Sequence, residues 1–327
     1  MRKTFSLLIL FTFFLSCKNG IKNEHAKVHE EEGTKVSTDK KSTTDESTFS
    51  KDNTPEKFII STDQLIGFYV GYFEKDDDKS SGKTLYVDDG YTWNRNNKIN
   101  ISIDQITDSI VIGHSVVAGN DRLFTGIMKR TKDTNKFTFK VKEPGDDKYD
   151  GEFTFTILNN DLFGHWTAYK NIDIQHRKYS LGRKTFKYDP NIMLDHSKEY
   201  IDWNKKIKTS KKVEMEENEF EEWILSEFAS ATDLIYKMNA SNKLLAKADV
   251  ENLKKGDLTI IRNTIYARHG YSFKNRPLRV FFDAQDWYIP VHANIKNDFT
   301  DLEKQNIQLL LKYEKNAAEY YDYFGRG

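Results

Sequence analysis

The feature that most constrains the fold is a period of two in apolar and polar residues, which recurs in segments between Phe58 and about Tyr188. Side chains of a β-strand point alternately to its two faces, so a period of two predicts antiparallel strands with one buried and one solvent-facing side. The alternation is clearest in three segments, whose apolar members are Ile99, Ile101 and Ile103; Phe137, Phe139 and Val141; and Phe153, Phe155 and Ile157.

Weaker versions of this pattern predict further strands at 66–73, 83–87, 109–117, 123–130 and 162–169. Turn-forming residues separate the strands: Asp88-Asp89-Gly90, Gly119-Asn120-Asp121, Pro144-Gly145-Asp146 and Asn159-Asn160-Asp161. Eight or so strands with short connections suggest a meander, and a meander closes most easily into an up-and-down barrel because closure removes exposed edges. An open sandwich is the alternative, and a lipocalin- or avidin-like barrel is only an analogy of pattern.

The N-terminal residues have the pattern of a targeting segment. Arg2 and Lys3 precede an apolar run over 5–15 that is too short to span a bilayer but fits a signal peptide. The run ends at Leu15-Ser16-Cys17, which contains the only cysteine of the chain and resembles a bacterial lipobox. This resemblance implies cleavage after Ser16 and acylation of Cys17, so that the lipid bilayer is a partner; an ordinary signal peptide is the alternative.

Composition divides the rest of the chain. After a signal peptide over 1–16, residues 17–57 combine the lipidated cysteine with a charged, Ser/Thr-rich tether that has too few apolar residues to fold. We expect the β domain at 58–188, a linker and helical bridge at 189–237 with a helical period from Phe220, and a mostly helical unit at 238–327. The expected class is therefore α+β. Lys+Arg and Asp+Glu are both 50, and this zero net charge argues against nucleic acid as a partner.

Helix signals are strong in the C-terminal unit. Asp257 is suited to cap a helix that Gly270 ends in the left-handed conformation. Pro277 suits the first turn of a second helix, and Thr300 with Glu303 forms a capping box for a long last helix.

The same unit carries a recognisable motif. Tyr266-Ala267-Arg268-His269-Gly270 spells the sequence after which the YARHG domain is named, and residues from about 238 to 315 resemble that family. Agreement extends to Ser241, Leu244-Leu245, Arg262-Asn263, Ile265, Tyr271, Phe273, Phe282, Trp287-Tyr288, Glu303 and Asn306. The resemblance implies a small extracellular module of bacterial secreted proteins and lipoproteins, without an established catalytic activity.

His269 invites an enzymatic interpretation as a general base, with Tyr266 and Arg268 as partners. A general base needs an orienting carboxylate and a nucleophile, and no acid lies between Asp257 and Asp283. A distant acid such as Glu303 leaves a hydrolase open as the less favoured hypothesis. The alternative is structural: the arginines pair with acids of the last helix or with carbonyls, and the tyrosines fill the core.

Cationic residues concentrate between Leu258 and Val280 without an acid. Arginine suits bidentate capture of carboxylate or phosphate, and a solvated charged face is the other explanation. The candidate binding residues, including the motif and one aromatic neighbour, are Arg262, Tyr266, Ala267, Arg268, His269, Gly270, Arg276, Arg279 and Trp287. In the β domain, His114 and His165-Trp166 could line a cavity, although satisfied core residues are commoner there.

No complete catalytic motif is present: the chain has neither Gly-x-Ser-x-Gly nor His-Glu-x-x-His, and one cysteine allows no Cys-based metal cluster. We therefore expect a non-catalytic binding module without cofactor or metal, lipid-anchored in the bacterial outer membrane or cell envelope, facing the periplasm or the outside. Its candidate partners are an anionic envelope polymer or another envelope protein. The alternative function is a barrel that binds a small hydrophobic ligand.

Overall fold

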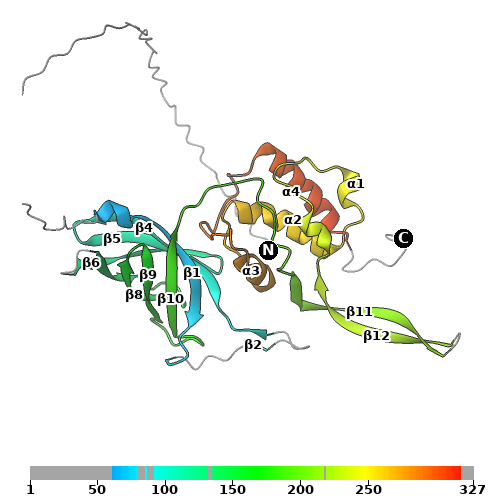
Figure 1. Cartoon of the computed structure of the whole chain (residues 1–327), viewed down its shortest axis with the longest axis horizontal. Helices are drawn as coiled ribbons and strands as arrows, with labels where there is room; N and C mark the ends of the chain where they lie inside the picture. Colours follow the sequence, from blue (N-terminus) through cyan, green and yellow to red (C-terminus); the bar gives the residue numbers. More distant parts are fainter. Residues whose placement is uncertain (1–60, 80–84, 87–91, 132–134, 217–218, 318–327) are drawn as a thin grey trace, which may run out of the picture. The chain divides into compact units, whose positions relative to one another are not determined.

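The structure is a computed structural model that describes residues 61–79, 85–86, 92–131, 135–216 and 219–317 (Figure 1). The predicted signal peptide, Cys17 and the predicted tether lie outside these residues. No helix among the described residues combines the length and apolar character needed to cross a bilayer.

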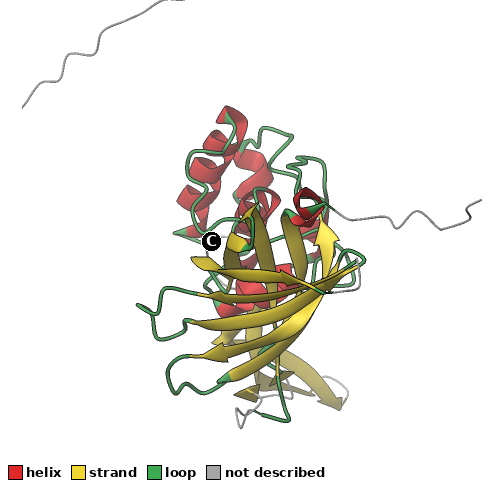
Figure 2. Cartoon of the chain, turned by 90° about the vertical axis from the view of Figure 1, so that its left-hand side faces the viewer, coloured by secondary structure: helices red, strands yellow, loops and turns green. Residues whose placement is uncertain are grey.

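Eight antiparallel strands form a closed barrel in the N-terminal half (Figure 2). Each strand pairs with its neighbour in sequence and β1 closes the ring between β10 and β4, as expected for an up-and-down meander. The predicted α+β class and the barrel are confirmed. The barrel strands are β1 (Gly67–Lys75), β4 (Asn97–Thr107), β5 (Ile110–Val117), β6 (Asn120–Arg130), β7 (Lys136–Lys142), β8 (Gly151–Leu158), β9 (Asp161–Ala168) and β10 (His176–Lys184).

Apolar side chains fill most of the barrel interior. The alternating residues of the three clearest segments all point inward and are almost completely buried, and Phe139 stacks on Phe155 with ring centroids 4.7 Å apart. Towards one mouth, Phe73, Phe153 and Trp166 form a mutually packed aromatic layer. The core therefore ends below this mouth, where the inward positions become polar.

One predicted strand lies outside the barrel and one barrel strand was missed. Residues 83–87 contribute only β2 (Leu85–Tyr86), which pairs with β3 (Thr92–Trp93) in a separate two-stranded sheet. The eighth barrel position belongs to β10. The alternation is hard to see in β10 because Arg177 occupies an inward-facing position near the mouth. Only Tyr179 and Leu181 are therefore buried apolar residues of this strand.

The expected linker and helical bridge is wrong for 201–230, where the chain forms a long hairpin of β11 (Ile201–Glu216) and β12 (Glu219–Ser230) (Figure 1). Phe220, Trp223 and Ile224 have helical spacing but remain exposed on the hairpin, Ile224 at 73%. Trp203 and Ala229 are buried at the base of the hairpin, but beyond the base both faces of the ribbon meet solvent. No buried face imposes a period of two there. Cross-strand neighbours such as Lys212 and Glu222 are of opposite charge, which supports the pairing instead.

The C-terminal unit contains short and long helices: η2 (Asp233–Tyr236), α1 (Lys247–Val250), α2 (Lys255–Arg268), α3 (Arg276–Asp283) and α4 (Asp301–Glu314); a further short helix, η1 (Thr62–Leu65), precedes the barrel. α2 packs against α4, and their apolar faces share one buried cluster. Residues of α3 join the same cluster, so the three longest helices form a single core.

The helix caps agree with the sequence except at one residue. Gly270 ends α2 with φ +72°, Pro277 lies in the first turn of α3, and Thr300 with Glu303 forms the capping box of α4. Asp257 is not the N-cap of α2: it lies one turn inside, where its carboxylate accepts from the backbone N–H of Lys254 at 3.2 Å. An acid in the first turn still stabilises α2, because the N-terminal end of a helix is positive.

The barrel and the helical unit contact each other through α3 and the outer face of β1 and β4. The hydroxyl of Tyr72 donates to the Asp283 carbonyl at 2.8 Å, and the Lys98 backbone N–H donates to the Asp283 carboxylate at 2.7 Å. The Lys98 ammonium donates to the carbonyls of Gln285 and Tyr288. Burial lowers the pKa of Lys98 to about 8 and raises the pKa of Asp283 to about 7. This contact places α3 beside the polar barrel mouth.

Candidate functional site

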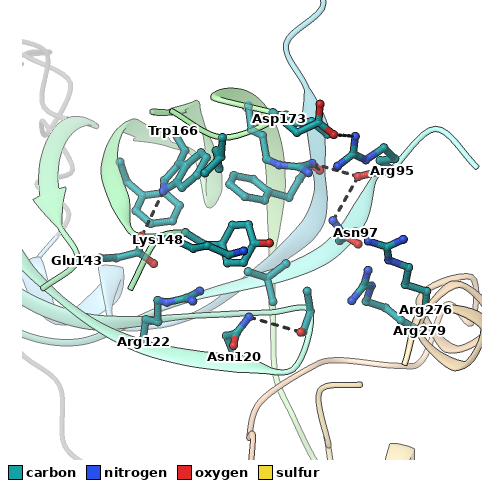
Figure 3. A pocket seen from close by; sticks show the side chains of 18 of the residues that line it. Arg95, Asn97, Asn120, Arg122, Glu143, Lys148, Trp166, Asp173, Arg276 and Arg279 are labelled. Atoms are coloured by element: carbon teal, nitrogen blue, oxygen red, sulfur yellow. Dashed lines mark hydrogen bonds and ion pairs between the residues drawn. The ribbon is translucent and has the colours of Figure 1, made fainter. Parts of the chain in front are cut away.

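A cavity of about 650 Å³ opens at the barrel mouth beside α3 (Figure 3). Its lining contains six cationic side chains and two carboxylates, so positive charge predominates. The charged residues are Arg95, Arg122, Glu143, Lys148, Asp173, Arg177, Arg276 and Arg279. The packed aromatic layer of Phe73, Phe153 and Trp166 forms an apolar floor.

Strand alternation directs two arginines into the mouth. Arg122 on β6 is in phase with the buried Phe124, and Arg177 on β10 is in phase with the buried Tyr179. The Arg122 guanidinium is held by Asp150 at 2.7 Å and by Asp147 at 3.0 Å. Its charge is therefore already compensated by protein carboxylates.

Glu143 is a buried carboxylate in the cavity wall. It accepts hydrogen bonds from the Ser115 hydroxyl at 2.6 Å, the Gly151 N–H at 2.8 Å and the Trp166 indole N–H at 3.2 Å. Burial raises its pKa, while these donors and the nearby Arg122 oppose the rise. Since its oxygens already have donors, Glu143 serves mainly to hold the wall together.

Four arginines surround the other side of the cavity, and we name Arg95, Arg177, Arg276 and Arg279 the arginine wall. Arg95 forms an ion pair with Asp173. Arg177 donates from Nη1 to the carbonyls of Phe73 at 2.8 Å and Arg95 at 3.1 Å. Burial, with the neighbouring Arg95 and Arg279, lowers the pKa of Arg177 to about 10. The neighbouring cations Arg95 and Arg279 therefore add to the effect of burial on Arg177.

The α3 arginines extend over Trp93, with the guanidinium carbons of Arg276 and Arg279 at 5.7 and 5.4 Å from its ring. Arg279 is only 8% exposed, and its Nε has no hydrogen-bond partner in the described structure. Its Nη1 makes one long bond, 3.4 Å, to the Lys274 carbonyl. The buried Oδ1 of Asn97, also in the lining, likewise lacks a partner among the described residues. The cavity thus retains polar groups that the fold does not use.

The structure separates the arginines that the sequence grouped together. Arg262 forms a two-point ion pair with Glu314 of α4, with Nε–Oε2 at 2.7 Å and Nη2–Oε1 at 3.0 Å. Arg268 is buried and donates to the Ile192 carbonyl and to the Ser241 hydroxyl. Arg276 and Arg279 alone reach the cavity. Their aromatic neighbour is Trp93, whereas Trp287 packs on Tyr288.

The remaining motif residues hold the helical unit together. Ala267 is buried, and Tyr266 packs edge-on against Phe299 and Tyr271. Gly270 occupies a positive φ where an added Cβ would lie 3.0 Å from Val291 Cγ2, so the turn requires glycine.

His269 contacts the distant acid that the sequence left open. Its Nε2 lies 2.8 Å from the Glu303 carboxylate, which also accepts from the Tyr188 hydroxyl at 3.0 Å, and the Tyr188 ring stacks on the imidazole. Burial raises the pKa of Glu303, but the hydrogen bonds from His269 and Thr300 outweigh it and lower the value overall. The cavity at the barrel mouth does not include this cluster, which joins the end of α2 to the start of α4.

Of the three barrel residues that the sequence suggested as cavity-lining, one faces the cavity and two face outward. Trp166 points inward and lines the cavity. His114 and His165 point outward, where they pair with Asp121 and Asp76 respectively. In the described part of the chain no group of His, Cys, Asp and Glu side chains is arranged to hold a metal ion.

Sequence reasoning missed the barrel half of the site: Arg95, Arg122, Glu143, Lys148 and Arg177. A signal was available, since Arg122 and Arg177 are charged residues at positions where the alternation calls for apolar ones. A charge in an inward register position of a small barrel indicates a mouth or a cavity.

Comparison with known proteins identifies the helical unit. Residues 232–315 match the family model of the YARHG domain. Neither the curated proteins nor the solved structures contain a significant match to the chain. The helices that follow the barrel and the hairpin, from η2 to α4, therefore form a YARHG domain.

Proposed function

We propose that this protein is a non-catalytic, lipid-anchored envelope protein that binds an anionic ligand at the barrel mouth. The observation that carries the proposal is the cavity itself, in which Arg276 and Arg279 of the YARHG domain complete a positively charged lining begun by barrel residues. Arginine forks favour carboxylate and phosphate groups, and an apolar floor provides contact area for the rest of a ligand.

The two binding hypotheses raised by the sequence converge on this cavity. The arginines of α3 supply the anion-binding groups, and the aromatic floor of the barrel supplies the apolar surface. A purely hydrophobic ligand fits less well because most of the barrel interior is filled by side chains and the remaining space is bordered by charges. An amphiphilic anion matches both halves of the lining.

The hydrolase hypothesis gains little support. The His269–Glu303 pair is buried, is shared with the capping box of α4, and lies outside the cavity lining. The pair acts as a structural link between two helices, which accounts for its geometry without a substrate.

Calorimetric titration of the purified full chain tests the binding proposal. Naphthalene-1-sulfonate and 1-naphthoate share an aromatic body with the uncharged 1-naphthol. We expect both anions to bind more tightly than 1-naphthol, and Arg276→Gln, at an exposed position, to reduce anion binding about tenfold. Arg130→Gln, at the end of β6 remote from the mouth, is the matched control. Equal affinities for all three compounds, or no effect of Arg276→Gln, would refute the proposal.

The envelope location rests on the lipobox-like segment at Cys17. Each buried methylene of an acyl chain contributes about 0.8 kcal/mol, so several chains hold a protein on a membrane stably. Metabolic labelling with a clickable fatty acid should mark the wild-type chain and leave Cys17→Ser unlabelled. An unlabelled wild-type chain recovered from the culture fluid would remove the anchor from the proposal.

A further inference from the structure

We propose that the ligand is a dianion, of the phosphomonoester class, whose phosphoryl group contacts the arginine wall and whose apolar body lies on the aromatic floor. This inference rests on the proposed function and adds to it the charge of the ligand and its orientation. It follows from the charge of each side of the cavity, from unused hydrogen-bond donors, and from the position of Glu143.

The arginine wall carries more positive charge than one carboxylate could neutralise. Arg95 has Asp173 as its ion-pair partner. The described residues place no carboxylate within ion-pair distance of Arg177, Arg276 or Arg279. Asp283, four residues after Arg279 on α3, interacts electrostatically with Arg279, and its carboxylate accepts from the backbone N–H of Lys98. The buried Lys98 ammonium also interacts with this carboxylate and offsets its charge. Three guanidinium charges therefore remain, and a singly charged ligand would leave two of them uncompensated in a partly desolvated site.

Unused donors point to the same group. The Nε of Arg279 is buried without a partner, and burying an unsatisfied donor costs free energy unless a ligand or water accepts from it. Arg276 lies one turn before Arg279 on α3, and its guanidinium contacts the same indole ring of Trp93. A phosphoryl group offers three oxygens to such adjacent forks, whereas a carboxylate offers two.

The opposite side of the cavity fixes the orientation. Figure 3 places Glu143 and Trp166 across the cavity from Arg276 and Arg279. A second anion beside Glu143 would be repelled, and the oxygens of this carboxylate already accept from Ser115, Gly151 and Trp166. The uncharged part of the ligand is therefore directed to this side, where Phe73, Phe153 and Trp166 offer ring surfaces.

The test compares two ligands of the same body and different charge, 1-naphthyl phosphate and naphthalene-1-sulfonate, by titration calorimetry of the full chain between pH 5 and pH 8. We expect the phosphate to bind at least about tenfold more tightly at pH 8, where it is a dianion. This advantage should disappear below about pH 6, where the phosphate takes up one proton and becomes a monoanion. Because the sulfonate keeps one charge throughout, it reports any titration of the charged groups around the ligand. These are the arginine wall, Arg122, Lys148, Glu143 and Asp173 in the lining, and Asp283 next to Arg279.

Two variants separate the possible outcomes. Arg276→Gln should reduce the preference for phosphate over sulfonate, and Arg130→Gln should leave it unchanged. If both ligands bind with equal affinity at pH 8 and both depend on Arg276, the dianion inference is overturned while anion binding stands. If neither ligand depends on Arg276, the proposed function itself is wrong. Circular dichroism of each variant excludes unfolding as the cause.

Discussion

Replacing Glu303 by alanine is expected to destabilise the YARHG domain by about 4 kcal/mol. The side chain is fully buried and its carboxylate accepts from three residues: His269, Tyr188 and Thr300. Alanine removes the acceptor from all three donors at once. The buried His269 donor left without a partner costs up to about 3 kcal/mol. Water can replace the acceptor for the half-buried Tyr188 and the exposed Thr300, so these two donors add about 1 kcal/mol together.

Glu303→Gln provides a graded comparison. The amide preserves the shape and one oxygen, and the Tyr188 hydroxyl can turn to accept from the new NH₂ group. What remains is the loss of charge in the bonds from His269 and Thr300, about 1–2 kcal/mol. The order of unfolding free energies should therefore be wild type, then Glu303→Gln, then Glu303→Ala.

Urea unfolding followed by circular dichroism measures these differences, with Asp301→Ala as a control at an exposed position of the same helix turn. Because the pKa of Glu303 is lower when folded than its ordinary 4.5, its charge stabilises the fold above that value. The advantage of wild type over Glu303→Gln should decline as the pH falls through the folded pKa. If Glu303→Ala costs no more than Asp301→Ala at pH 7, the structural role assigned to the His269 cluster is refuted.

Three further outcomes are expected. Gly119→Ala should raise amide hydrogen exchange in α3, because the new Cβ would lie 2.1 Å from Lys274 Cγ, two residues before the helix, at a φ of +75° and would push this segment away from the barrel. Unchanged exchange in α3 would contradict this contact. Gly270→Ala should lower the unfolding free energy by about 1–2 kcal/mol through its left-handed conformation, as a thermal melt can show. Asp283→Asn should gain stability relative to wild type as the pH rises from about 4 to 7, since the unfolded carboxyl ionises near 3.8 while the folded one stays protonated to about pH 7. Urea midpoints that run parallel for both proteins across this interval would contradict that sign.

The barrel was predictable because its strands have one wet face. Residues such as Ile99 and Phe153 alternate with polar neighbours, and burial of one side leaves that mark in the sequence. β10 was not found because Arg177 interrupts the apolar series. The β11–β12 hairpin was not found because both of its faces are exposed over most of its length. In the hairpin, Phe220, Trp223 and Ile224 imitate helical spacing although their side chains lie on solvent-exposed strands.

The candidate site was only half predictable. Arg276 and Arg279 stood out because they lie in an acid-free segment, but the same reasoning grouped them with Arg262 and Arg268, which the fold uses internally. Tertiary structure makes this division: Glu314 and the Ile192 carbonyl approach from distant segments. The pairing of α3 with a barrel mouth likewise has no local signal, because it depends on contacts such as that between Asp283 and Lys98.

The division of the cavity between two parts of the chain has a practical consequence for truncation. A fragment that stops after β10 would retain every barrel strand, yet it would lack Arg276 and Arg279 and with them half of the arginine wall. The YARHG domain alone would retain those two arginines without Trp93 beneath them or the aromatic floor beyond. Either piece could pass a folding assay and still lack the proposed binding site, so the proposal requires that binding assays use both parts of the chain together.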